Sequence, residues 1–170
     1  YFRSSNRVYE NQAMSGINNN EIQNIYLKPG EIWISQKPTI VSTVLGSCVS
    51  VTFFSKALSM GGICHGQLPE CVKDDPSERA SCKYVDSAIL AILKEFEKQC
   101  VKIDEIEVKL FGGSEMLKKK EVSSKIRVGK LNVEKAIKLL KEKKIKIKAS
   151  DVGGPVGRKI LFYSHTGEVF

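Results

Sequence analysis

Residues 49 to 54, Val-Ser-Val-Thr-Phe-Phe, are the part of the sequence that most limits the fold. This nearly continuous run of apolar and β-branched residues is typical of a strand that is buried on both faces. Such a strand lies inside a sheet, and a further layer of structure must cover each side of that sheet. The run therefore predicts a layered domain with a sheet in its interior.

Periodicity predicts the other elements. Apolar runs bounded by glycine, proline or polar turns predict strands at 32–34, 39–43, 60–68, 105–111, 145–149, 159–163 and 168–170. Apolar residues spaced three and four apart predict helices over 84–100 and 132–143, the second with Asn132 as its N-cap. The polar stretch 70–81 is expected to be a loop. Together these elements predict an α/β fold, a single-domain layered sandwich of mixed sheet and two main helices.

The length of 170 residues suits one domain. Residues 1–24 are polar and are expected to form a flexible tail, with the folded domain at 25–170. No apolar run approaches the roughly 20 residues of a membrane helix, and residues 1–20 lack the apolar core of a signal peptide. Neither membrane insertion nor secretion is therefore expected.

The cysteines point to a reducing compartment. Five is an odd number and excludes a complete internal disulfide framework, which favours the cytoplasm. The chain has no Cys-x-x-Cys pair and only two histidines, and the spacing of Cys64, Cys71 and Cys82 does not match a zinc ribbon or finger. The sequence predicts neither a bound metal nor a cofactor.

The net charge of +8 first suggests a nucleic acid or an acidic surface as partner. The basic residues are concentrated between Lys118 and Lys148, where 12 lysines and Arg127 stand against three glutamates, a local charge of +10. The rest of the chain carries a net charge of −2. No aromatic residues interleave with these lysines to stack on bases, so the pattern favours a solvated face over nucleic-acid binding.

A cysteine and a histidine stand where two neighbouring strands can bring them together. Cys48 opens the strand that contains residues 49–54, and His65 lies towards the end of the next predicted strand. Their separation of 17 residues fits two strands of about seven residues and a small loop, so we expect a cross-strand pair. An imidazolium beside a thiol stabilises the thiolate, so the pKa of Cys48 is expected well below the free value of about 8.5.

Further groups complete a candidate catalytic centre. Ser42 and Thr43, just upstream, are two alternative hydroxyls for holding the second ring nitrogen of His65. The turn that contains Gly46 and Ser47 exposes main-chain N–H groups near the sulfur, where they can hold an oxyanion. On spacing alone, however, a buried structural cysteine and a hydrogen-bonded strand histidine are the more common outcome.

A series of short motifs runs through the chain from about Tyr26 to Phe170. They are Leu45-Gly46-Ser47-Cys48-Val49, Gly61-Gly62 through His65-Gly66-Gln67-Leu68-Pro69, Tyr84-Val85-Asp86, Phe111-Gly112-Gly113-Ser114-Glu115-Met116, Gly129-Lys130-Leu131-Asn132, Asp151-Val152-Gly153-Gly154, Gly157-Arg158-Lys159 and Thr166-Gly167-Glu168-Val169. In order and spacing they resemble the chemoreceptor glutamine deamidase (CheD) family. Each motif alone is weak, but the series favours a functional role for Cys48 and His65.

The resemblance implies a cytoplasmic protein-glutamine glutaminase that acts on methyl-accepting chemotaxis receptors. It implies a sandwich similar to CheD and to cytotoxic-necrotising-factor-like deamidases, with Cys48 as nucleophile and His65 as base. Some members carry a threonine six positions before the cysteine, where this chain has Ser42 and its threonine is Thr43, so the third catalytic residue stays open between the two. A CheC-type phosphatase of the response regulator CheY is implied as a further partner. Leu131, where many members carry arginine, departs from the family pattern.

Three other functions remain open. A binding module with a vestigial centre, acting only through a CheC-like partner, is disfavoured because Cys48 and His65 are both present. A lysine-rich nucleic-acid-binding domain is the second alternative. The third keeps the thiol chemistry but transfers the acyl group to an amine or cuts a peptide bond, and residue types alone do not separate these reactions from side-chain hydrolysis.

Overall fold

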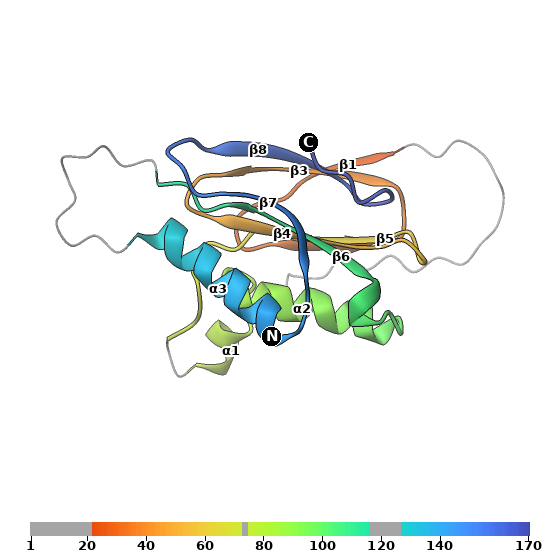
Figure 1. Ribbon diagram of the computed structural model, residues 1–170, viewed down its shortest axis with the longest axis horizontal. Coiled ribbons are helices and arrows are strands. Elements are labelled where there is room, and N and C mark those ends of the chain that lie inside the picture. The colour runs from red at the N-terminus through yellow and green to blue at the C-terminus, as the bar shows by residue number, and fades with distance from the viewer. Residues whose placement is uncertain (1–21, 73–74, 116–126) are drawn as a thin grey trace, which may run out of the picture.

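The computed structural model describes residues 22–72, 75–115 and 127–170, and this part of the chain contains two β-sheets (Figure 1). One sheet has the strand order β1 (Gln23–Tyr26), β3 (Thr39–Leu45) and β8 (Arg158–Tyr163). The other has the order β2 (Ile32–Ser35), β5 (Met60–Cys64), β4 (Val49–Ser55), β6 (Ile106–Gly112) and β7 (Ile147–Val152). Pairs β1–β3 and β6–β7 are parallel and the other pairs are antiparallel, so both sheets are mixed.

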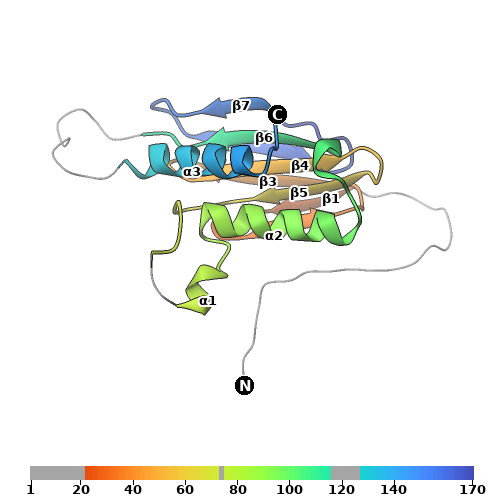
Figure 2. The same cartoon turned by 60° about the horizontal axis from the view of Figure 1, so that its bottom comes forward.

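Helices α2 (Val85–Lys98) and α3 (Val128–Glu142) cover the face of the five-stranded sheet that is turned away from the three-stranded sheet. Figures 1 and 2 show the resulting three layers, with the five-stranded sheet in the middle. The short helix α1 (Pro76–Arg79) and a 3₁₀ turn at Ile103–Glu105 lie in the connections. Every residue of β4 is buried because β4 lies inside the middle layer, as its apolar run predicts.

Two apolar clusters join the layers. Between the helices and the middle sheet, Phe53 of β4 packs with Ile92 and Phe96 of α2, and burial of each such side chain stabilises the fold by about 1.5–3 kcal/mol. Gly62 permits this contact, since a Cβ there would lie 2.9 Å from Ile92 Cγ2. The second cluster fills the space between the sheets and includes Leu45 of β3, with Cys48 packed against it. The candidate site therefore lies in the layer between the two sheets.

The predicted fold class and most predicted elements are confirmed, with shifted boundaries. Strand β1 begins at Gln23, two residues before the expected start of the domain, and residues 1–21 lie outside the described part of the chain. Residues 116–126, which include Lys118, Lys119 and Lys120, also lie outside it. Among the described residues, no helix is long and apolar enough to cross a membrane.

Several predictions of local structure are wrong. Helix α3 begins at Val128 with Arg127 at its N-cap, so Asn132 is not the cap, and its amide bonds to carbonyls outside the helix instead. The stretch 70–81 is not all loop, because the Asp75 side chain accepts from two N–H groups and starts helix α1.

Two predicted strands are shorter than expected. The strand over 60–68 ends at Cys64, so His65 lies just beyond β5, and only isolated bridges continue the pairing. Residues 168–170 form a single bridge between Val169 and Phe162 rather than a strand. In both places, isolated bridges take the place of regular strand pairing.

Candidate active site

Cys48 and His65 lie at the ends of adjacent strands and face the same side of the middle sheet. Beyond the paired residues of β4 and β5, an isolated antiparallel bridge joins Val49 to Gly66 with the same register. Cys48 and His65 are therefore diagonal neighbours across the strand pair, on the face that packs against the three-stranded sheet. The predicted cross-strand pair is confirmed.

His65 is held by Thr43 of the facing sheet. The imidazole is 1% exposed, and its Nδ1 lies 2.7 Å from Thr43 Oγ1. The Thr43 hydroxyl donates its only hydrogen to the Leu27 carbonyl at 2.8 Å. It must therefore accept from an Nδ1–H of His65, which leaves Nε2 with a free lone pair. Nε2 is buried with no hydrogen-bond partner among the described residues, so it is available as a proton acceptor.

Ser42 takes no part in this arrangement. Side chains alternate along β3, so Thr43 is buried between the sheets while Ser42 lies on the opposite face. The Ser42 hydroxyl donates to the Ile25 carbonyl at 3.2 Å. Of the two hydroxyls that the sequence leaves open, the structure brings Thr43 and not Ser42 to His65.

Burial shifts the pKa values of both Cys48 and His65 towards the neutral forms. It raises the pKa of the Cys48 thiol, and the Cys48 main-chain N–H beside the sulfur opposes this shift. It lowers the pKa of His65, opposed by the Leu27 carbonyl and the Glu31 carboxylate. The expected low pKa of Cys48 is therefore wrong for the free protein, because removal from water outweighs the nearby stabilising groups. Both shifts therefore favour a neutral thiol and a neutral imidazole.

The turn before β4 is fixed through its main-chain carbonyls. Three consecutive carbonyls each accept a hydrogen bond from the chain after β6 or from α3. The pairs are Gly46 O with Ser114 N–H (2.8 Å), Ser47 O with Asn132 Nδ2 (2.9 Å) and Cys48 O with Gly113 N–H (2.8 Å). Gly112 has a φ of 100°, and a Cβ there would lie 2.3 Å from Cys48 O. Only glycine lets β6 approach the turn this closely.

The N–H groups of the same turn point away from these partners. In a trans peptide the carbonyl and the following N–H point in opposite directions, and the described residues contain no cis peptide. With the carbonyls of Gly46 and Ser47 bound on one side, the N–H groups of Ser47 and Cys48 face the other. Neither N–H, nor that of Gly46, donates to a main-chain carbonyl in the described residues. They are free to hold an oxyanion.

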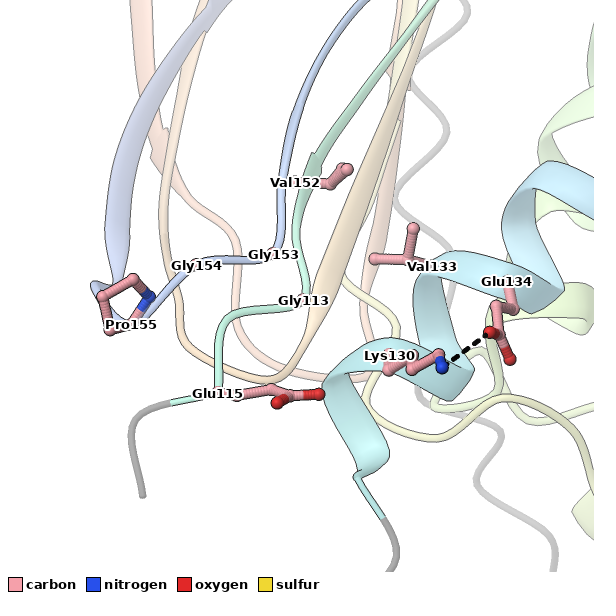
Figure 3. Close-up of a pocket in the computed structure, with 9 residues that line it drawn as sticks. All are labelled: Gly113, Glu115, Lys130, Val133, Glu134, Val152, Gly153, Gly154 and Pro155. Atoms are coloured by element: carbon pink, nitrogen blue, oxygen red, sulfur yellow. Dashed lines mark ion pairs between the residues drawn. The ribbon is translucent and has the colours of Figure 1, made fainter. Parts of the chain in front are cut away.

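A cavity of about 590 Å³ opens beside this turn (Figure 3). Its lining comes from the chain after β6, from the first turns of α3 and from the loop after β7: Gly113, Glu115, Lys130, Val133, Glu134, Val152, Gly153, Gly154 and Pro155. Cys48 and His65 do not line it. It adjoins the turn through Gly113, whose N–H binds Cys48 O, so it lies next to the carbonyl side of the turn.

The other cysteines lie apart from the Cys48–His65 pair. Cys64 precedes His65 but faces the helices and is buried in their core. Cys71 and Cys82 are half-buried and Cys100 is exposed. Within 22–72, 75–115 and 127–170, no group of three or more His, Cys, Asp or Glu side chains is arranged to hold a metal ion. Cys48 is thus the thiol that shares a face with the free imidazole nitrogen.

The sequence alone does not assign the supporting residues of the turn to the site. Besides its place in a family motif, Asn132 carries a structural signal, because it lies four and eight residues before Ala136 and Leu140, which are buried on α3. A polar residue that continues a buried helical face needs partners inside the protein. The sequence does not indicate which carbonyls these are.

Known proteins match this chain over most of its length. A family model described as CheD chemotactic sensory transduction matches residues 67–170. The chain belongs to the CheD family. A probable chemoreceptor glutamine deamidase CheD 2 of Geobacter sulfurreducens is 44% identical over 149 residues, which cover 88% of this chain and 89% of that protein.

Two further CheD relatives extend the similarity. A probable chemoreceptor glutamine deamidase CheD of Maridesulfovibrio salexigens is 42% identical over 159 residues, covering 90% of this chain and 93% of the relative. One of Methanococcus maripaludis is 32% identical over 143 residues, covering 84% and 90%. The resemblance seen in the motifs is therefore confirmed at the level of the family.

Proposed function

We propose that this protein is a protein-glutamine glutaminase that converts glutamine side chains of chemotaxis receptors to glutamate. The observation that carries the proposal is the pairing of Cys48 with a His65 that is fixed at Nδ1 by Thr43 and free at Nε2. A thiol, an oriented base and unpaired N–H groups are the parts that acyl transfer needs. The relatives are named probable chemoreceptor glutamine deamidases, which supports the same reaction and substrate class.

The first step forms a thioester. His65 Nε2 takes the proton of the Cys48 thiol as the sulfur attacks the carboxamide carbon of the substrate glutamine. The N–H groups of Ser47 and Cys48 hold the negative charge that develops on the amide oxygen, each worth about 3 kcal/mol in comparable sites. The imidazolium then gives its proton to the leaving nitrogen, which departs as ammonia.

The second step releases glutamate. His65, neutral again, takes a proton from a water molecule as that water attacks the thioester carbon. The carbon–sulfur bond breaks, the proton returns to the sulfur of Cys48, and a glutamate side chain leaves. Thr43 acts through His65 by holding the Nδ1–H tautomer in both steps. The cycle consumes one water and releases one ammonia.

The proposal includes a place of action and a second partner. The family resemblance implies a cytoplasmic enzyme, so the protein is proposed to act in the cytoplasm, in keeping with its free cysteines. A CheC-type phosphatase is proposed as a regulatory partner on the family resemblance. A pulldown and a phosphatase assay with Cys48→Ala separate the two roles, because retained binding and regulation would make them independent.

The test of the main proposal is mass spectrometry of a receptor cytoplasmic fragment incubated with the protein. The wild type is expected to convert specific glutamines to glutamate, and Cys48→Ala is expected to convert none above background. Cys100→Ala removes an exposed cysteine and is the matched control, which should retain wild-type conversion. Equal conversion by wild type and Cys48→Ala would reject Cys48 as the nucleophile.

A further inference from the structure

We infer that Asn132 is a positioning residue that fixes the direction of the Cys48 main-chain N–H, an inference that rests on the proposed function of Cys48. Asn132 lies on α3, outside both strands of the site, and is 0% exposed. Its side-chain amide donates two hydrogen bonds of 2.9 Å, one to Ser47 O and one to Gln67 O. Ser47 precedes Cys48, and Gln67 follows His65 by two residues. One side chain therefore ties the two strand ends together.

The contacts fix which end of the Asn132 amide is nitrogen. Both partners are carbonyl oxygens, which only accept, so the donating NH₂ must face them. The amide oxygen is buried with no hydrogen-bond partner among the described residues. An unpaired buried acceptor is unfavourable, and alanine suits a helix interior better than asparagine. Helix stability therefore does not account for this residue, whereas the two bonds to the site do.

The bond to Ser47 O acts on Cys48 through one peptide plane. The Ser47 carbonyl and the Cys48 N–H point in opposite directions in that plane, so holding the carbonyl on the α3 side turns the N–H towards the Cys48 sulfur. The Ser47 side chain is exposed, so its packing does not hold the peptide. Asn132 thus orients an N–H that lowers the pKa of the Cys48 thiol and that stabilises an oxyanion in the proposed reaction.

The neighbouring peptides of the turn have their own partners. The carbonyls of Gly46 and Cys48 are held by Ser114 and Gly113, and the N–H of Gln67 donates to the Lys83 carbonyl at 2.8 Å. Loss of the Asn132 amide therefore leaves the turn in place and frees one peptide to rotate. The expected result is a selective loss of Cys48 reactivity rather than a general loss of structure.

The experiment compares Asn132→Ala and Asn132→Ser with wild type and with Leu139→Ala. Leu139 is a buried core residue of α3, seven positions after Asn132, and forms no side-chain hydrogen bond, so it controls for lost helix packing. The pH dependence of Cys48 alkylation by iodoacetamide is read by mass spectrometry of the Cys48 peptide, on the folded fraction after size-exclusion chromatography. The same samples give kcat and KM on a receptor fragment.

Both Asn132 variants are expected to alkylate about tenfold more slowly at neutral pH, with the profile moved to higher pH, because the sulfur loses its N–H partner. Their kcat should fall about tenfold with KM nearly unchanged. Unchanged or faster alkylation of Cys48 would overturn the inference, as would an equal loss in Leu139→Ala. If wild type fails to deamidate the receptor, the proposed function fails, while the alkylation profiles still decide the role of Asn132.

Discussion

The two halves of the site are held in different ways. On the histidine side, one side chain holds another. The Thr43 hydroxyl on the facing sheet accepts a hydrogen bond from His65 and donates one to the Leu27 carbonyl. On the cysteine side, the main chain is held, since the carbonyls around Cys48 bind partners that follow β6 or lie on α3. The base is therefore sensitive to a single hydroxyl, while the nucleophile depends on how closely distant segments approach it.

The largest effect tests the histidine side. Thr43→Val keeps the side-chain shape but leaves the His65 Nδ1–H and the Leu27 carbonyl without their hydroxyl partner. An unpaired buried group costs about 1–3 kcal/mol, so kcat is expected to fall about 10- to 100-fold and the melting temperature to drop. Ser42→Ala removes the adjacent hydroxyl and should leave kcat unchanged. Deamidation kinetics and thermal unfolding give the readout. An equal loss of kcat in Thr43→Val and Ser42→Ala would contradict the claim that Thr43, and not Ser42, holds His65.

The pH dependence tests the charge state of the pair. His65 must be neutral to accept a proton, and burial lowers its pKa from 6.5, so kcat/KM should hold down to pH 6.5 and decline only below it. Burial raises the pKa of Cys48, so its alkylation rate should still increase above pH 8.5 or so. An acid limb centred above pH 6.5, or alkylation that reaches its plateau near neutral pH, would favour a preformed thiolate–imidazolium pair.

The smallest effect concerns the lysine-rich surface. Lys135 is bound within the fold by Glu70 and Asp86, whereas Lys138 and Lys141 are exposed and form no ion pair among the described residues. Reversing Lys138 and Lys141 to glutamate should slow association with an acidic receptor fragment several-fold at low salt and little at high salt.

Lys56→Glu, at the opposite end of β4 from Cys48, is the matched reversal for that association experiment. Stopped-flow association rates give the readout. If the Lys138 and Lys141 variant associates at the wild-type rate, these lysines have no role in binding the receptor and only form a solvated surface. The same reversals at Lys118, Lys119 and Lys120 remain a prediction for residues outside the described part of the chain.

Local sequence predicts the pairing of Cys48 with His65 better than it predicts the groups that hold the two residues. The run 49–54, the hairpin spacing and the turn at Cys48 depend on neighbours in sequence, so the Cys48–His65 pairing follows from period and loop length. The sequence does not show whether Thr43 or Ser42 contacts His65. That depends on which face of β3 packs against the middle sheet, and only the fold sets this.

The support of the turn depends on segments far from it in sequence. Asn132 lies 85 residues from Ser47, and its role follows only when α3 is packed on the middle sheet. The same holds for the pKa of Cys48, because the chemical type of its neighbours indicates a low value while the depth of burial, which only the fold sets, raises it.

The central claim is hydrolysis of a glutamine side chain through Cys48, and deamidation in water enriched in heavy oxygen tests it most directly. A receptor fragment is incubated in this water with wild type or with Cys48→Ala, and a small primary amine is added to a parallel sample. With wild type, each converted glutamine should gain one heavy oxygen, with the backbone intact and no amine incorporated, while Cys48→Ala should give no product. Conversion by Cys48→Ala at the wild-type rate, or a product that carries the amine or a cut peptide bond in place of the oxygen, would contradict the account.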